Sequence, residues 1–276
     1  MIVDSTISVD VGNSTVKIGM LDVEVSAAAS GQDTATFEEI ELGGRLEIFR
    51  YPLAVADWSD RLLGEVGKMA AGHDSLTWLV ASVNTPASDR LRRAISFARP
   101  KDQWRLITRN DIGLAIEVRN PDLVGIDRLL GAAGAKRFAV DGSAISIDAG
   151  SAVTVDLVRD GRFLGGAIMP GIRMQLAILN QATDRLPRVD AASNLGLEIP
   201  GRDTQAAMRA GVMLGIAGGI DRLLYHYSEL CGTTPGIVIT GGDATSLVEL
   251  IRHRCVIQED LVLGTIARIA ARGQLK

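Results

Sequence analysis

The sequence predicts an α/β protein built from two similar halves, and two observations support this prediction. Short apolar runs typical of buried strands alternate with segments whose apolar residues recur at helical spacing, which indicates layers of sheet and helix. The segment SVDVGNS at residues 8–14 also matches SIDAGSA at residues 146–152, which lies half of the 276-residue chain later. Because each copy lies at the turn of a predicted hairpin, we expect a duplicated domain with a cleft between the copies.

The first half is predicted to open with a hairpin and then to alternate helices and strands. Two strands over residues 7–22 are joined at Gly12, Asn13 and Ser14, and the small and polar residues of 23–45 indicate a long loop or hairpin. The elements expected after it are a helix over 57–72, a buried strand over 76–83, a helix with Asn84 as its N-cap, and a strand over 104–108.

The second half begins at a predicted boundary near residue 115, which divides the chain into domains of residues 1–115 and 116–276. Asp160-Gly161 is a strong hairpin signal because both residue types tolerate the left-handed backbone of a tight turn. The expected elements are a loop and small-residue helix over 119–138, three strands over 143–171, helices over 171–185 and 204–231, a strand ending in the double glycine of GIVITGGDA, and a final helix, strand and helix.

Composition excludes several classes of function. The chain is 47% hydrophobic and 22% charged, so it can build a core, and its formal net charge of −4 argues against nucleic acid as a partner. We expect no membrane span, no signal peptide and a cytoplasmic protein. The two cysteines, Cys231 and Cys255, fit neither a metal motif nor a disulfide framework, and the three histidines are scattered and near no acidic cluster.

The two matching turns have the composition of a phosphate-binding site. Glycine lets backbone N–H groups approach phosphate oxygens, and hydroxyl side chains donate to the same oxygens. Carboxylates suit Mg²⁺ or its water shell, and a lysine supplies a movable positive charge near the transferred group. The residues concerned are Asp10, Gly12, Ser14 and Lys17 in the first copy and Asp148, Gly150, Ser151 and Thr154 in the second. The alternative is that both are plain hairpin turns.

Three further segments carry candidate residues. Asp127, at the start of a predicted helix, is a candidate to accept a hydroxyl proton, and Arg128 to hold a carboxylate or phosphoryl charge; the alternative is an exposed helix-terminal acid. Gly241 and Gly242 permit a flat ligand to lie against the backbone, or form an ordinary strand-to-helix turn. In the helix over 171–185 we expect Met174, Leu176 and Leu179 to pack in the core, and Thr183 to be a cap or an interface contact.

The order of DVGNSTVK, NPDLVGIDR, DAGSAVTVD, GGAIMPGIRMQLAIL, TDRLP and ITGGDA resembles type III pantothenate kinase, of the acetate kinase, sugar kinase, Hsp70 and actin superfamily. The resemblance covers roughly residues 7–22 and 115–265. It implies an α/β fold of two ribonuclease H-like domains, as in actin-like ATPases, with ATP in the cleft between them. The implied reaction is ATP-dependent phosphorylation of pantothenate at its primary hydroxyl, in coenzyme A biosynthesis.

The resemblance also implies roles for individual residues. Asp10 would organise Mg²⁺ and phosphates, Asp127 would be the base, and Asp148 would help to hold K⁺ or NH₄⁺. Phosphate and nucleotide contacts would come from Gly12, Asn13, Ser14, Lys17, Gly150, Ser151, Thr154, Gly241 and Gly242. Pantothenate would contact Val118, Asn120, Gly125, Asp127, Arg128 and, from the neighbouring subunit of a homodimer, Thr183.

The sequence departs from the family pattern at two positions near the expected substrate. Val118 stands where the family often has a tyrosine, and Asp184 stands where an alanine is usual after the interface threonine. Two alternatives therefore stay open beside the kinase. One is a member of the same fold that acts as a regulatory or accessory binding protein without catalysis. The other is a phosphotransferase for another small hydroxy acid or amide.

Overall fold

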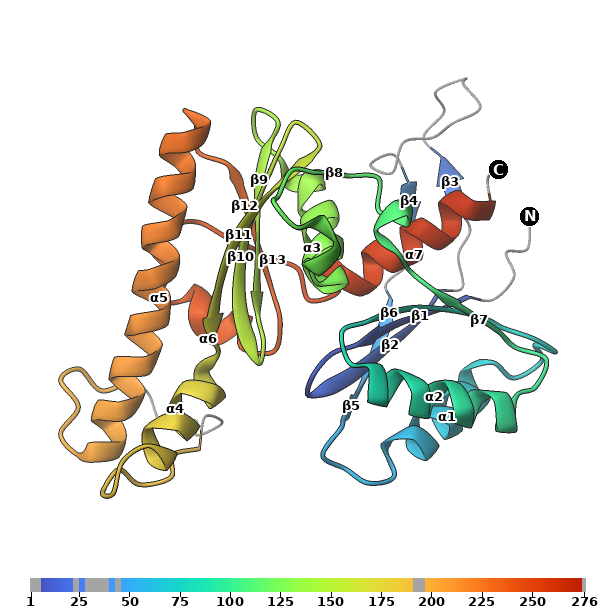
Figure 1. Ribbon diagram of the computed structural model, residues 1–276, viewed down its shortest axis with the longest axis horizontal. Helices are drawn as coiled ribbons and strands as arrows, with labels where there is room; N and C mark the ends of the chain where they lie inside the picture. The colour runs from blue at the N-terminus through green and yellow to red at the C-terminus, as the bar shows by residue number, and fades with distance from the viewer. Residues whose placement is uncertain (1–5, 22–24, 28–39, 43–45, 191–196, 275–276) are drawn as a thin grey trace. The chain divides into compact units, whose positions relative to one another are not determined.

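A computed structural model describes residues 6–21, 25–27, 40–42, 46–190 and 197–274 (Figure 1). At residues 21, 25–27, 40–42 and 273–274 it describes the backbone alone. Contacts divide the chain into two compact units. The first comprises residues 1–114, 120–137 and 260–276, and the second comprises 115–119 and 138–259. The domain boundary near residue 115 stays a prediction. The first compact unit also includes residues 120–137 and 260–276, which lie beyond that boundary in the sequence.

The first unit contains a five-stranded sheet in the order β5-β2-β1-β6-β7. β1 is antiparallel to β2, and β2 to β5, whereas β1 and β6 are parallel, as are β6 and β7. The bounds are β1 Thr6–Val11, β2 Thr15–Leu21, β5 Glu47–Pro52, β6 Thr77–Ser82 and β7 Gln103–Leu106. The predicted opening hairpin and the buried strand over 76–83 are therefore confirmed.

One face of this sheet packs on α1, Trp58–Met69, and α2, Thr85–Ala98, which lie together below the sheet in Figure 1. Alternate residues of β1 enter that core, as a strand with period two requires. Asn84 is the N-cap of α2, as predicted, because its side chain accepts a hydrogen bond from the Ala87 N–H at 3.1 Å.

The opposite face of β1 packs on α7, Leu261–Gln274, which also packs on α3, Ile126–Ala135. A Cβ on Gly134 of α3 would lie 2.7 Å from the Leu261 side chain, so the two helices approach closely. Within residues 23–45, β3 Val25–Ala27 and β4 Ile40–Leu42 form an antiparallel pair, and the rest of the predicted loop lies outside the described residues.

The second unit repeats the strand order of the first. Its sheet runs β13-β12-β9-β10-β11-β8, with β9 antiparallel to β10, β10 antiparallel to β11, and β9 parallel to β12. The bounds are β8 Ala115–Ile116, β9 Ser143–Ala149, β10 Ala152–Arg159, β11 Arg162–Pro170, β12 Gly236–Thr240 and β13 Val256–Ile257. β9 thus lies between β10 and β12 as β1 lies between β2 and β6, whereas β8 has no counterpart in the first sheet. This shared order agrees with the predicted duplication, and the α/β class is confirmed.

Helices α4 Ile172–Gln181, α5 Thr204–Cys231 and α6 Ala244–Val248 belong to the second unit, with α5 running along its sheet (Figure 1). Leu176 of α4 is buried and Leu179 packs on the same core, as expected. The expectation for Met174 is wrong: its side chain is 51% exposed, because it lies on the face of α4 turned away from that core.

Single-turn 3₁₀ helices complete the described structure at Arg109–Asp111, Pro121–Leu123 and Lys136–Phe138. The predicted hairpin turn between β10 and β11 is confirmed, since Asp160 and Gly161 both have positive φ, of 49° and 72°. None of the helices in the described ranges has the length and apolar character needed to cross a bilayer.

The Asp102 carboxylate links the start of β6 to the end of α2. It accepts hydrogen bonds from the Leu76 N–H at 3.0 Å, the Trp78 indole at 2.8 Å and the Arg99 guanidinium at 2.7 Å, and its side chain is fully buried. These bonds fix the start of β6 against the loop before β7.

We expect Asp102→Ala to lower the free energy of unfolding by about 3–5 kcal/mol, because the substitution leaves buried donors without an acceptor. Urea denaturation followed by tryptophan fluorescence measures this change. The exposed pair of Lys68 and Glu65 supplies the control, and Lys68→Ala should change stability by less than about 1 kcal/mol. Equal effects of the two variants would contradict the structural role given to Asp102.

Candidate active site

The carboxyl ends of β1 and β6 meet at one edge of the first sheet, because these strands are parallel neighbours. Val11 pairs with Ser82, and the Val83 N–H donates to the Val11 carbonyl at 3.0 Å. The start of α3 lies at the same edge, since a Cβ on Gly125 would lie 3.7 Å from a Val83 methyl group. In α/β sheets ligands bind outside the carboxyl ends of the strands.

Asp10 and Lys17 form an ion pair at this edge. They are directly opposite in the β1–β2 ladder, so their side chains share one face, and Lys17 Nζ lies 3.3 Å from Asp10 Oδ2. Asp10 is only 6% exposed, whereas Lys17 is partly accessible. The pair therefore puts a fixed carboxylate beside a cation that can reach a ligand.

Asp127 lies close enough to Asp10 for their charges to interact. It is the second residue of α3, and its Oδ1 accepts a hydrogen bond from the Arg128 N–H at 2.8 Å. Burial raises the pKa of the Asp127 carboxyl, the negative charge of Asp10 raises it further, and the Arg128 N–H and guanidinium oppose both. The alternative of an exposed helix-terminal acid is not met, because Asp127 is partly buried.

The turn between β1 and β2 projects from the same edge. The Gly12 N–H donates to the Thr15 carbonyl at 3.0 Å and closes the turn, while Asn13 and Ser14 are exposed. A Cβ on Gly12 would lie 3.3 Å from that carbonyl, which is a tight contact. The turn thus presents polar groups on a closely packed backbone.

The second unit has a corresponding edge at the carboxyl ends of β9 and β12. Asp148 stands where Asp10 stands in the first sheet, but the residue directly opposite it is Thr154, where Lys17 faces Asp10. The Gly150 N–H donates to the Ala152 carbonyl at 3.0 Å and closes a turn one residue shorter than the first. The two turns are therefore related in position and different in charge.

Two glycines hold the turn at 150–151 in place. Gly241, with φ of +100°, follows β12, and a Cβ there would lie 2.4 Å from the Ala149 carbonyl oxygen and 2.6 Å from Asp148 Oδ1. A Cβ on Gly171 would lie 2.2 Å from the Gly150 carbonyl oxygen. Glycine is required at both positions because the backbones touch. Gly242 is exposed beside this contact.

The remaining predicted residues lie in separate places. Val118 follows β8 in the second unit, where its methyl group would lie 3.4 Å from a Cβ on Gly165. Asn120 belongs to the first unit and precedes the 3₁₀ turn at 121–123. Thr183 follows α4, where its hydroxyl donates to the Leu179 carbonyl at 2.6 Å. This bond caps the end of α4, which is one of the two roles expected for Thr183. The other role, a contact across a subunit interface, stays a prediction.

Several polar residues at these edges escaped the sequence analysis. Arg50 of β5 is directly opposite Lys17, so Asp10, Lys17 and Arg50 form a row across three strands. Asp243 accepts a hydrogen bond from Arg173 at 3.0 Å in the second unit. Asp243 follows the double glycine directly, which is a usable signal, whereas strand register is needed to find Arg50.

His253 contacts a single carboxylate, since its Nδ1 lies 2.9 Å from Asp221 Oδ1. Asp221 also accepts a hydrogen bond from the Arg252 N–H, so it organises the loop before β13. Burial, with a smaller effect of Asp221, raises the pKa of the nearby Cys255 thiol to about 11. The thiol is therefore protonated at neutral pH, as expected of an ordinary cysteine.

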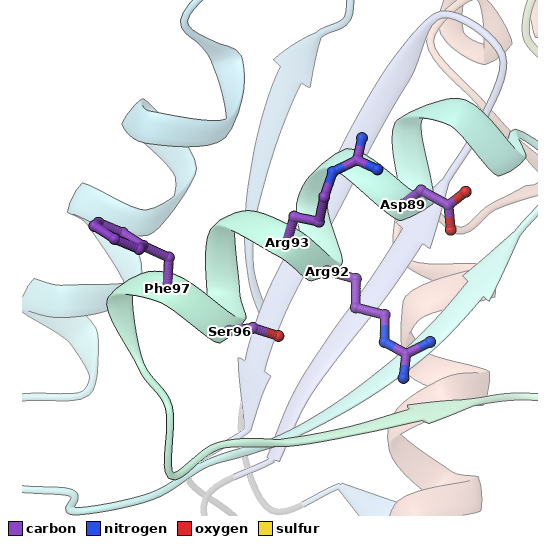
Figure 2. A pocket seen from close by; sticks show the side chains of 5 residues that line it. All are labelled: Asp89, Arg92, Arg93, Ser96 and Phe97. Carbon is purple, nitrogen blue, oxygen red and sulfur yellow. The ribbon is translucent and has the colours of Figure 1, made fainter.

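A hollow on the outer face of α2 is distinct from both edges. Figure 2 shows its five lining residues spaced along this one helix: Asp89, Arg92, Arg93, Ser96 and Phe97. Phe97 is 92% exposed, and none of the five is a predicted site residue. The hollow is a depression between surface side chains of a single helix and lacks the converging polar groups of an active site.

A sequence model of the type III pantothenate kinase family matches residues 6–226 of this chain. The chain belongs to the type III pantothenate kinase family. A member from Rhodopirellula baltica is 38% identical over 266 residues, covering 92% of this chain and 93% of the relative. A member from Oleidesulfovibrio alaskensis is 30% identical over 257 residues, covering 92% of both chains.

Solved structures show the same fold at low sequence identity. A Campylobacter jejuni protein assigned to the Baf family of transcriptional activators superposes with a TM-score of 0.55, at 20% identity and with 98% of both chains covered. A Sinorhizobium meliloti protein assigned as a 2-dehydro-3-deoxygalactonokinase gives 0.52, at 14% identity, with 98% of this chain and 99% of that chain covered. These likenesses concern the architecture and agree with the predicted kinase fold.

The raised pKa of Asp127 has a consequence for stability. The folded protein holds the proton of Asp127 more tightly than the unfolded chain, so the cost of the charge appears as pH rises through the ordinary aspartate pKa of about 3.9. We expect Asp127→Asn to unfold at a higher urea concentration than the wild type at pH 7.5, with the difference shrinking toward pH 4.

Asp122→Asn, which changes an exposed carboxylate shortly before α3, is the matched control and should not reproduce this pattern. If Asp127→Asn is less stable than the wild type at pH 7.5, the polar contacts of Asp127 outweigh its burial.

Proposed function

We propose that this protein phosphorylates pantothenate at its primary hydroxyl with ATP, an early step of coenzyme A biosynthesis, in the cytoplasm. Membership of the type III pantothenate kinase family supports the reaction. The observation that carries the proposal is the position of Asp127, a partly buried carboxylate electrostatically coupled to Asp10, which is paired with Lys17. This arrangement supplies a base beside a phosphate-binding group.

Asp127 is proposed as the group that accepts the hydroxyl proton of pantothenate. A base is most useful when its pKa lies toward the working pH, and burial moves the pKa of Asp127 upward in that direction. The Arg128 N–H orients the carboxylate through its Oδ1. We assign contacts with pantothenate to Arg128, Gly125, Asn120 and Val118.

Phosphoryl transfer requires mainly that phosphates be positioned and their charge neutralised. We assign the positive charge to Lys17, whose pairing with Asp10 holds it at the sheet edge until a phosphate is present. The backbone and polar groups of Gly12, Asn13 and Ser14 would serve one set of phosphate oxygens, and those of Gly150, Ser151 and Thr154 another. Gly241 and Gly242 would face the nucleotide.

The chain fits Mg²⁺ that is held mainly by phosphates and water. Among the residues that the structure describes, no three acidic, histidine or cysteine side chains gather as a metal-binding group. Mg²⁺ in kinases usually takes only one or two carboxylates besides phosphate and water, and Asp10 meets that need. When bound, Mg²⁺ neutralises phosphate charge. We assign to Asp148 a part in holding a monovalent cation, K⁺ or NH₄⁺.

A homodimer is part of the proposal. Apolar side chains are exposed on neighbouring elements of the second unit, which suits an interface: Ile168, Met174, Ile178 and Leu214. Thr183 follows α4, the helix that carries Met174 and Ile178, and would reach the substrate of the other subunit. An accessory role without catalysis is not favoured, because the chain keeps Asp10, Asp127 and Asp148 and its relatives are named type III pantothenate kinase.

The proposal is tested first through Asp127. We expect Asp127→Asn to lower kcat by about 100- to 10,000-fold, the usual contribution of a general base, while binding of Mg²⁺-ATP changes little. Pantothenate-dependent ADP formation in a coupled assay and calorimetric titration with nucleotide measure the two effects. Asp122→Asn is the control and should keep the wild-type rate. Near-normal turnover by Asp127→Asn would rule out its role as the base.

The cation is tested by exchanging salts in the same assay. We expect ADP formation to require K⁺ or NH₄⁺ and to be lost in Na⁺. Asp148→Asn should lower activity at a fixed K⁺ concentration by about 10-fold or more, on the scale of changes at metal sites. Asp160→Asn, at the other end of β10, is the control. A rate that is the same in Na⁺ and K⁺ would remove the cation from the mechanism.

A further inference from the structure

Arg173 and Asp243 join two segments that are far apart in sequence. Arg173 is the second residue of α4, and Asp243 directly precedes α6, after the double glycine. Arg173 Nη2 lies 3.0 Å from Asp243 Oδ1. The two side chains differ in exposure: that of Asp243 is 14% exposed and that of Arg173 is 68% exposed.

Each partner lies next to a backbone contact with the turn at 150–151. The Asp243 N–H donates to the Ala149 carbonyl at 3.0 Å, and Gly171, two residues before Arg173, donates its N–H to the Ser151 carbonyl at 3.0 Å. The ion pair therefore closes a ring that runs from one side of this turn to the other.

The contacts within the ring leave little freedom. Cβ atoms on Gly241 and Gly171 would overlap with backbone oxygens of residues 149 and 150, so both segments already touch the turn. Arg173 Nη2 would lie 3.9 Å from a Cβ on Gly242, which puts the guanidinium directly beside the double glycine. The Arg173–Asp243 ion pair adds a side-chain contact to the two backbone hydrogen bonds that hold these segments against the turn.

We infer that Arg173 and Asp243 are positioning residues for the nucleotide. By tying α4 to the segment after β12, the pair fixes the Gly241-Gly242 backbone against the turn at 150–151, the surface proposed to receive a nucleoside triphosphate. This inference rests on the proposed function, because it uses the assignment of Gly241 and Gly242 to the nucleotide.

The low exposure of the Asp243 side chain separates this pair from ordinary surface ion pairs. Exposed pairs contribute little, because water solvates both charges equally well when they separate. Asp243 lacks that access, and burial raises the pKa of its carboxyl while Arg173 lowers it. Loss of Arg173 leaves a poorly solvated carboxylate, which is relieved by moving the segment that carries it.

The test uses Arg173→Gln and Asp243→Asn in the full chain, with Arg173→Lys as the conservative variant. Arg202→Gln is the matched control, since Arg202 pairs with Glu198 at 3.2 Å on the surface of the same unit. Binding of a non-hydrolysable ATP analogue with Mg²⁺ is measured by calorimetry, and KM for ATP, KM for pantothenate and kcat are measured by ADP release.

We expect the Kd of the analogue and the KM for ATP to rise about 10-fold in Arg173→Gln and Asp243→Asn, the scale of a broken, partly buried charge pair. The KM for pantothenate and kcat at saturating ATP should stay within about twofold, and Arg173→Lys should recover part of the loss. A purely structural role would instead lower thermal stability and affect all constants together.

The inference is overturned if both variants bind the analogue as tightly as Arg202→Gln, or if the wild type binds no nucleotide. Its failure is distinguishable from failure of the proposed function. A wild type that binds the analogue in an Arg173-dependent way and yet does not phosphorylate pantothenate would uphold the positioning role and remove the kinase assignment.

Discussion

The parallel pairing of β1 with β6 in the first sheet, and of β9 with β12 in the second, is the constraint on which the candidate active site depends. Parallel neighbours end at the same edge, so the pairing of β1 with β6 brings Asp10 beside the segment at Ser82 and Val83. The pairing of β9 with β12 brings Asp148 beside Gly241 in the same way. Residues separated by about 70 to 90 positions in the chain thereby become neighbours.

The two edges have similar strand pairing and different side chains. The first places a cation, Lys17, opposite its aspartate, whereas the second places a hydroxyl, Thr154, in that position. A lysine follows charge that moves during phosphoryl transfer, and a hydroxyl contributes a hydrogen bond at a fixed place. The duplicated hairpins therefore carry different side chains at equivalent positions, a positive charge in the first unit and a hydroxyl in the second.

Stability and the proposed function oppose each other at Asp127. The burial that raises its pKa also makes the folded protein carry a poorly solvated charge, and the start of α3 and the Arg128 N–H recover only part of that cost. A site that keeps a carboxylate in such surroundings is typical of groups that transfer protons. Gly171 and Gly241 of the second unit differ from Asp127 in this respect. They have no side chain, and this allows two backbone segments to lie in contact.

The sequence by itself determined the alternation of strands and helices, the duplicated turns and most candidate residues, because these depend on periodicity and local turn chemistry. Asp10, Lys17 and Asp127 could be named from motifs alone. Tertiary structure decided that α3 and α7 pack in the first unit and that Met174 is exposed. It also decided which charges meet: Arg173 with Asp243, and Arg50 opposite Lys17. Such contacts depend on strand register and helix docking, which are set by the packing of distant segments and leave no local signal in the chain.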